Sequence, residues 1–298
     1  MQASLITNPG SLIQAMRIYS NMNQQSLAER LNISKHELAL LESNEQSPSL
    51  DLWCHVMDHF GLPIDASRYG YIDFESIISI RSGIEENGFL LPLRYSQRKC
   101  IKVRELLPLL NFTANRYGEK ILTKIMEDLH VSPLFFHILD NQINVFFLAD
   151  FLEKLQSMAG VLNTDYANVA DYFANEKLHG SLAQLYRHCT TEKELVQTYL
   201  SELDKYERVF KYDLEALHEN NALLVHINYN SAELEDDLFE AGPETQVFLD
   251  EYREAKIMRL SQFPVNKKEI NNRLLSLSEV SSVYKGDSET VYKIEFSA

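Results

Sequence analysis

The stretch Asn23–Glu42, NQQSLAERLNISKHELALLE, has the spacing of a helix, a tight turn and a second helix. Asn23 can cap the first of these helices, because its side-chain oxygen can accept a hydrogen bond from an exposed backbone N–H. The chain must turn sharply at Asn32, and asparagine tolerates the left-handed backbone better than any residue except glycine. Ser34 and Glu37 form a capping box, in which each side chain satisfies the backbone N–H of the other residue. The pattern therefore predicts two short helices that meet at a tight corner.

Helical patterns continue on both sides of this corner, and five short helices are expected in the first 65 residues. Residues 11–19 carry an apolar stripe at helical spacing before the corner. After the corner, Pro48 opens another helix, because proline is tolerated in a first helical turn. The apolar stripe of that helix ends at Phe60, and Gly61 terminates it. The opening segment is therefore predicted to be an all-α domain.

This segment resembles the helix-turn-helix domain of the Xre/Cro-repressor family over about residues 8–63. The resemblance rests on the stretch MNQQSLAERLNISKHELALLESNEQSPSLDLW. The residues that match the family pattern are Gln24, Ala28, Asn32, Ile33, Ser34, Leu38, Glu42 and Ser47-Pro48-Ser49-Leu50. The sequence departs from the family at Asn32 and Asn44, where glycine is usual, and at Leu40, where many members carry a polar side chain that contacts bases.

The resemblance implies a domain that binds double-stranded DNA, with the second helix of the corner in the major groove. Backbone N–H groups at both helix starts can hold phosphate without a formal charge. Glutamine can pair with adenine, and an alanine methyl group can touch thymine. The DNA-binding residues implied by the resemblance are Asn23 and Gln24 for phosphate and Gln25, Lys35, His36 and Ala39 for the groove, with Ser34 at the helix start. A homodimer would place two such helices about one duplex turn apart on an operator.

The charge of the chain opposes this reading. Up to Asp65 there are three Lys and Arg against seven Asp and Glu, and the whole chain has a formal net charge of −15. Such a surplus predicts repulsion from nucleic acid unless basic groups are concentrated somewhere. The first basic cluster comes later in the chain, and its candidate phosphate contacts are Arg94, Arg98 and Lys99, followed by Lys102 and Arg104. Two interpretations stay open: a phosphate-binding patch beside the DNA, or a solvated helix face near a domain border.

Composition places the chain among soluble globular proteins, with 45% hydrophobic and 24% charged residues. The three cysteines are widely spaced, which argues against a disulfide framework and favours a reducing cytoplasm. The first residues lack a signal-peptide pattern, and the apolar runs are too short to span a membrane. A cytoplasmic protein is therefore expected. Its predicted parts are a helix-turn-helix domain over 1–66, a linker over 67–92 and a domain for effector sensing and dimerisation over 93–298.

The last two-thirds of the chain are predicted to form a mostly helical α+β domain with an antiparallel sheet. Two strand patterns, RVFKYDLEAL and ALLVHINYN, alternate like a hairpin, and SSVYKGDSETVYKIEFSA reads as a second hairpin around residues 285–288. The acidic run AELEDDLFE is expected to be a solvated loop. The helices expected in this part span residues 101–116, 119–130, 132–139, 144–159, 165–175, 180–188, 191–205 and 244–260.

Within this part, GEKILTKIMEDLHVS and LHGSLAQLYRHCTTEKELVQTYL resemble the ligand-sensing half of AraC-type activators. The competing template is the helical-repeat sensor of peptide-responsive Xre-type regulators, and the two hairpins argue against it. Either resemblance implies an effector, which is a small molecule or a peptide. The segment PLFFHILDNQINVFFLADF holds five phenylalanines, enough to line an apolar pocket, but packing in the core is the favoured reading.

Motifs for catalysis and for metal binding are missing from the sequence. There is no GxSxG, P-loop, GxGxxG or HExxH pattern, so an enzyme and a cofactor are not expected. His188 and Cys189 are adjacent, and their side chains would point apart on a helix. His55 and His59 lie one helical turn apart without an evident third ligand, so no metal is expected. The leading prediction is a DNA-binding transcriptional regulator; the alternative is a protein-binding adaptor or anti-regulator that uses its acidic head as a protein contact.

Overall fold

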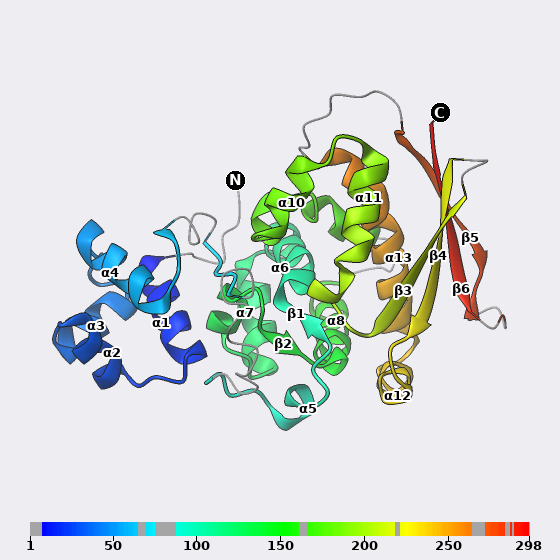
Figure 1. Cartoon of the computed structure of the whole chain (residues 1–298). Helices are drawn as coiled ribbons and strands as arrows, with labels where there is room; N and C mark the ends of the chain where they lie inside the picture. The colour runs from blue at the N-terminus through cyan, green and yellow to red at the C-terminus, as the bar shows by residue number, and fades with distance from the viewer. Residues whose placement is uncertain are drawn as a thin grey trace.

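The protein is a mixed helical chain with an antiparallel sheet at one end, as Figure 1 shows. Helices α1–α4 lie at the end opposite the sheet, and the remaining helices fill the space between them. The α+β architecture predicted from the sequence is therefore confirmed. The computed structural model describes residues 8–64, 70–74, 88–160, 166–217, 221–263, 272–283, 287 and 289–297.

Four α-helices lie within residues 8–64, where five had been expected: α1 (Pro9–Tyr19), α2 (Gln24–Leu31), α3 (Lys35–Glu42) and α4 (Leu50–Phe60). Their apolar stripes face one another and form a core of their own, to which Leu12, Leu27, Leu38 and Met57 contribute. Side chains of Asn23, Ser34 and Ser49 cap α2, α3 and α4 by accepting a backbone N–H bond. Local caps and one shared core thus fix the positions of these helices.

The predicted helices of the middle of the chain are present, several with a 3-10 end or a 3-10 helix in place of an α-helix. The predicted helix over 132–139 is the 3-10 helix η2, and the predicted helix over 165–175 is split. The elements are α5 (Leu93–Ser96), β1 (Ile101–Lys102), α6 (Val103–Tyr117), α7 (Glu119–Asp128), η2 (Pro133–His137), β2 (Gln142–Ile143), α8 (Val145–Ala159), α9 (Tyr166–Val169), η4 (Ala170–Tyr172), η5 (Glu176–Leu178), α10 (Leu182–His188), α11 (Glu192–Ser201) and η6 (Leu203–Lys205).

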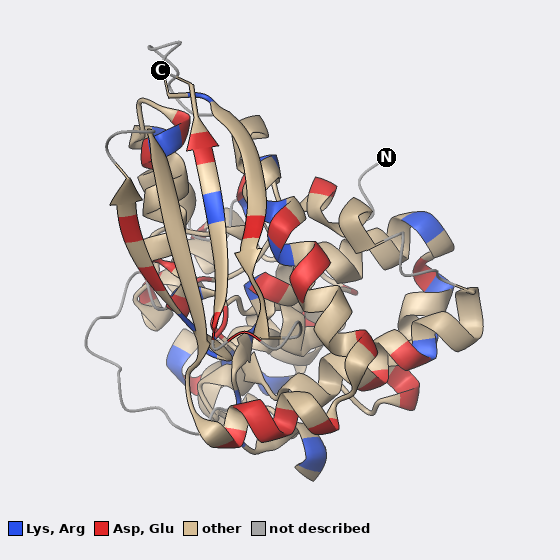
Figure 2. Ribbon diagram, turned by 90° about the vertical axis from the view of Figure 1, so that its right-hand side faces the viewer, with Lys and Arg blue, Asp and Glu red and all other residues tan. Residues whose placement is uncertain are grey.

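The sheet is built from two hairpins that meet side by side, in the strand order β3-β4-β6-β5 with antiparallel neighbours. The hairpin predicted from alternation is confirmed: Leu214 faces Val225 across β3 and β4. Figure 2, which looks onto the sheet, shows both signs of charge on its strands. The elements of this part are β3 (Phe210–Leu217), β4 (Ala222–Tyr229), α12 (Ala232–Glu240), α13 (Pro243–Arg259), η8 (Leu260–Gln262), β5 (Leu274–Ser281) and β6 (Thr290–Phe296).

Two expectations for this part were wrong. The acidic run AELEDDLFE is helix α12, not a loop, because Ser231 caps it and Leu238 is fully buried. The first strand of the second hairpin runs over 274–281, so it ends where it had been expected to begin. The turn expected over 285–288 lies mostly outside the described residues, as does the first hairpin's turn at 218–220.

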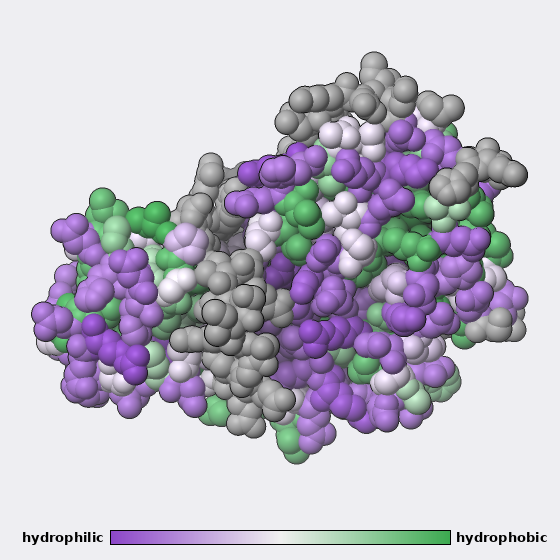
Figure 3. Space-filling view, viewed as in Figure 1, coloured by the Kyte–Doolittle hydropathy of each residue, from purple (hydrophilic) through white to green (hydrophobic). Residues whose placement is uncertain are grey.

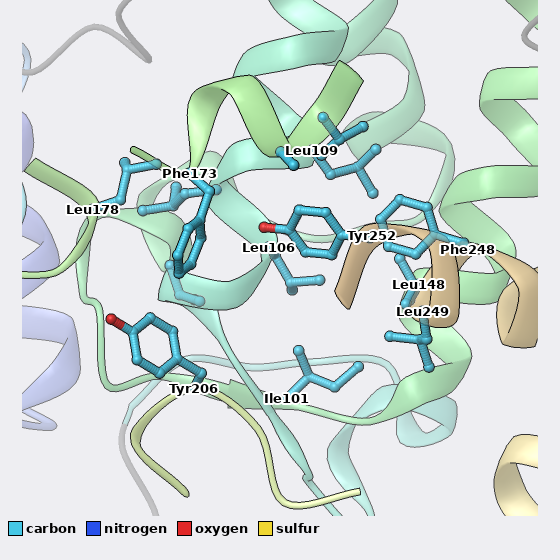
Figure 4. Packing of buried hydrophobic residues seen from close by; sticks show 14 of the residues in the cluster. Ile101, Leu106, Leu109, Leu148, Phe173, Leu178, Tyr206, Phe248, Leu249 and Tyr252 are labelled. Atoms are coloured by element: carbon cyan, nitrogen blue, oxygen red, sulfur yellow. The ribbon is translucent and has the colours of Figure 1, made fainter. Parts of the chain in front are cut away.

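The main core lies among α6, α8, α13 and the inner face of the sheet. Figure 4 shows Leu106 of α6 and Tyr252 of α13 near its centre, with Phe173 and Phe248 on either side. The five phenylalanines of the aromatic segment, at positions 135, 136, 146, 147 and 151, are all buried in this core, which confirms the packing interpretation. No helix of the described residues is long and apolar enough to cross a membrane.

The N-terminal helices are joined to the main body through residues 70–74, which lie in the predicted linker. Ile72 forms a parallel bridge with Ile138. Ile72, Phe74 and Ile138 belong to the same core as the four helices, and the rings of Tyr19 and Phe74 stack with centroids 4.5 Å apart. Residues 70–74 therefore pack against both the N-terminal helices and the main body.

Candidate functional site

The corner between α2 and α3 has the local geometry predicted for it. The side chain of Asn23 accepts a bond from Ser26 N at 2.8 Å. Asn32 adopts the left-handed conformation, with φ 54° and ψ 42°, and ends α2. The hydroxyl of Ser34 then accepts a bond from Glu37 N at 3.0 Å and starts α3. Three short-range interactions of asparagine and serine thus set the direction of both helices.

A buried ion pair locks this corner to α1. Arg17 donates to both carboxylate oxygens of Glu42, at 2.6 and 2.8 Å, and to the carbonyl of Met22 at 3.0 Å. Gln24 donates to the same carboxylate at 2.9 Å. Because the Arg17 and Glu42 side chains are almost fully covered, the two-point geometry holds the end of α3 against α1. Gln24, which was predicted to contact phosphate, therefore has its side-chain amide engaged within the protein.

The first turn of α3 is open to solvent. Ser34, Lys35 and His36 are exposed, and Ala39 is half-buried one turn later. On α2, Gln25 is exposed and donates to Glu29 at 2.7 Å. The predicted groove residues thus occur on two helices that pack together. In Figure 3 the surface of this end of the molecule is largely hydrophilic.

The residues of the predicted basic cluster do not form one exposed patch, because several are paired with carboxylates or buried. Arg94 donates to Asp150 at 2.9 Å and lies over the Phe146 ring. Arg98 is paired with Asp237 of α12. Lys102 and Arg104 are buried, and Lys99 is half-buried. Figure 1 places α5, which carries Arg94, well away from α3. Phosphate would have to compete with Asp150 and Asp237 for the two arginines.

Arg104 lies in an ionic junction that the sequence did not reveal. Its Nη2 bonds Asp140 at 2.7 Å and Asp73 at 3.2 Å, and its Nη1 bonds the carbonyl of His179. Asp73 also accepts two bonds from Ser181, both at 2.9 Å, from the backbone N–H and the hydroxyl. Although burial opposes ionisation, Arg104 and the Ser181 donors keep the pKa of Asp73 below its usual value. This junction fixes residues 70–74, next to the N-terminal helices, onto α6.

The adjacent side chains of His188 and Cys189 have separate hydrogen-bond partners. The Cys189 thiol contacts the carbonyl of Leu185 and the hydroxyl of Thr198, and burial raises its pKa. His188 instead bonds the carbonyl of Gln184. Within the described ranges, no group of three or more His, Cys, Asp or Glu residues is placed to hold a metal ion.

Comparison with known proteins gave limited similarity. No protein-family model matches the chain, and no curated protein matches it. An H-NOX protein from S. oneidensis in the Fe(II)NO ligation state has a TM-score of 0.46 and 12% identity, over 66% of this chain and 100% of that chain. A doubly substituted Tt H-NOX has a TM-score of 0.43 and 10% identity, over 66% of this chain and 96% of that chain. Similarity at this level carries no argument about function.

Proposed function

We propose that this chain is a sequence-specific DNA-binding transcriptional regulator, with a helix-turn-helix domain of the Xre/Cro type in residues 1–66. The observation that supports it is the corner at Asn32, which is left-handed and is followed by the Ser34 cap. This corner leaves the first turn of α3, with Lys35 and His36, open to a partner. In the proposed complex α3 lies in the major groove, and these two side chains contact base edges or the adjacent phosphates.

The acidic character of the N-terminal part allows the salt dependence of DNA binding to be predicted. Arg17 is bound to Glu42, which leaves Arg30 and Lys35 as the exposed Lys and Arg side chains of α2 and α3. Two phosphate contacts give a salt slope of about −2 in log K against log salt. Most phosphate affinity then comes from backbone N–H groups at the helix starts. Binding should therefore depend on salt less steeply than in strongly basic regulators.

The test starts from the full chain and a library of random duplex DNA in low salt. One enriched sequence is expected, with related half-sites about one duplex turn apart if the protein is a dimer. His36→Ala should change the preferred bases, whereas Lys35→Gln should lower affinity for all sequences and reduce the salt slope by about 1. Lys120→Gln on α7 is the matched control, since it removes the same charge from an exposed site outside the helix pair. A library with no enriched sequence contradicts the proposal.

In this proposal, residues 93–298 provide the dimer contact and a site for an effector, and residues 67–92 connect the two parts. The reason is one of size, because the segment that carries the four N-terminal helices, residues 8–64, is only about a fifth of the chain. A bound effector changes DNA affinity only if it favours one of two arrangements of the heads.

A second function is favoured by the charge. Seven acidic residues against three basic ones up to Asp65 suit a protein-binding adaptor that contacts a basic partner. Leu50 at the start of α4 is 71% exposed, which also suits a protein contact. The DNA selection separates the two functions. Enrichment of a sequence supports the regulator, and its absence at low salt supports the adaptor.

A further inference from the structure

A cavity of about 290 Å³ lies between the inner face of the sheet and helices α12 and α13. Its walls come from both hairpins and both helices, so it forms only when the sheet packs on α13. The lining includes apolar, acidic and basic side chains. They are Phe210, Ile227 and Tyr229, then Glu235 and Asp250, and finally Arg253. The volume is near the lower end of the range for small-molecule sites, which suits a ligand of about amino-acid size.

Arg253 is the basic group of this cavity and is 5% exposed. Its guanidinium lies over the Phe210 ring, 4.3 Å from the centroid. Its Nε donates to the Tyr212 hydroxyl at 3.2 Å, and its Nη1 donates to Asp250 at 2.8 Å. These are its hydrogen bonds within the described part of the chain, which leaves the Nη2 donors for a ligand. A stacked, anchored guanidinium with free donors is suited to a carboxylate.

The acidic side of the cavity faces the same space. Asp250 is half-buried on α13, three residues before Arg253, and Glu235 is exposed on α12. Burial raises the pKa of Asp250, although the neighbouring Arg253 acts in the opposite direction. A cationic group of a ligand would compensate this desolvated carboxylate. The rings of Phe210 and Tyr229, with centroids 5.5 Å apart, and the buried Ile227 line the same cavity.

We propose that this cavity binds a small zwitterion, an α-amino acid with an apolar side chain. Its carboxylate bonds Nη2 of Arg253, its ammonium group pairs with Asp250 and Glu235, and its side chain packs on Phe210, Tyr229 and Ile227. A ligand with a single charge is disfavoured, because an anion meets two carboxylates and a cation meets the guanidinium. A ligand that carries both charges can bond the guanidinium and the carboxylates at once.

The prediction that an amino acid binds is based on the cavity alone, whereas the role of this amino acid as the effector rests on the proposed function. A structural connection to the N-terminal helices exists. Lys256, one turn after Arg253 on α13, is paired with Glu105 of α6. The preceding residue, Arg104, holds Asp73 beside the N-terminal helices. A ligand that shifts α13 would therefore act on α6 at the point where the head is anchored.

The experiment measures ligand affinity by calorimetry on the full chain with two matched sets of probes. The first set is L-leucine, its amine 3-methylbutylamine and its acid 4-methylpentanoate. The second is L-phenylalanine, 2-phenylethylamine and 3-phenylpropanoate. At least one amino acid is expected to bind about tenfold or more tightly than both of its single-charge analogues. The proposal is overturned if neither amino acid binds, or if an analogue binds as tightly.

Variants of the two carboxylates test the ammonium end of the ligand. Asp250→Asn should weaken the amino acid about tenfold and leave the acid probe unchanged or tighter. Glu235→Gln, on an exposed position, should act in the same direction more weakly, and it carries the test if Asp250→Asn does not fold. Arg259→Gln is the control, because it lies on the same helix and pairs with Asp171. Equal amino-acid affinity in the cavity variants and the control contradicts the proposal. The DNA selection is independent of this result, so failure of either proposal can be distinguished from failure of the other.

Discussion

At the scale of single residues, His179 shows how burial fixes a protonation state. It is fully buried, with Nε2 2.7 Å from the carbonyl of Phe173 and Nδ1 2.6 Å from the hydroxyl of Tyr206. A carbonyl can only accept, so Nε2 carries the hydrogen, and Nδ1 accepts from Tyr206. Protonation would place a second donor against that hydroxyl. Burial lowers the pKa of His179 to about 3 because it disfavours the charged ring.

The free energy of unfolding should therefore fall on acidification, and part of this fall should come from His179. The unfolded chain binds the proton near pH 6.5 and the folded chain only near pH 3, so the contribution is complete above pH 6.5 and is lost between these values. His179→Phe should be less stable at pH 7, yet its free energy of unfolding should fall less steeply, by up to about 1.4 kcal/mol per pH unit. Urea unfolding from pH 7 to pH 4 measures both curves. Parallel curves contradict the assignment.

The residues that sequence analysis misplaced are those whose partners are far away in the chain. Asn32 and Ser34 were assigned correctly, since a left-handed turn and a cap depend on a few neighbouring residues. Arg104 was grouped with exposed cations, because nothing local shows that Asp73 and Asp140 converge on it. Arg253 was missed for the same reason: a buried arginine looks like any other on a helix of mixed polarity.

At the scale of elements, α12 and β5 show where patterns mislead. In α12 the acidic run conceals Leu234 and Leu238, which lie one turn apart and face the core. Half of the residues of β5, LLSLSEVS, are serine or glutamate, so the segment lacks the apolar signal of a central strand, and its edge position leaves Leu275 and Val280 exposed. Helices α6, α7, α8, α11 and α13 were found because each exceeds two turns of regular pattern.

The contact between α6 and α13 depends on the buried pair of Glu105 and Lys256. Both side chains are almost fully covered, and within the described residues Oε2 of Glu105 has no hydrogen-bond partner. Lys256→Met should cost about 3–5 kcal/mol, because it leaves a carboxylate buried without a cation. Adding Glu105→Gln should recover a large part of this loss. Urea unfolding of both single variants and the double variant tests the coupling, and additive losses contradict it.

Acidity offers an independent check of that pair. Burial raises the pKa of Glu105 even with Lys256 opposing it, and removing Lys256 raises the pKa further. A raised folded-state pKa gives stability that is complete at low pH and is lost as pH rises. Lys256→Met should therefore regain stability, relative to the natural chain, when the pH falls from 7 toward 4. A stability difference that does not change with pH would place the carboxylate in a solvated site.

At the scale of the whole molecule, the two cores are separate clusters that are connected at two places. Phe89 packs against both of them, and Arg104 of α6 binds Asp73, which lies between Ile72 and Phe74 of the N-terminal core. N-terminal helices that are anchored at two points should not unfold alone. Structural changes that originate in the body can then reach the four N-terminal helices, and damage to the body should destabilise them.

The only tryptophan, Trp53 of α4, reports on the head without labels. Leu195→Ala on α11 removes a fully buried side chain from the main core and should cost about 2–5 kcal/mol. If the cores unfold together, the urea midpoint seen by Trp53 fluorescence should drop as much as the midpoint seen by far-ultraviolet circular dichroism. Asp171→Asn, a half-exposed carboxylate, is the control and should shift neither. A Trp53 midpoint that stays in place while the helical signal moves would mean that the head folds by itself, and the anchoring role of Asp73 would then have no consequence.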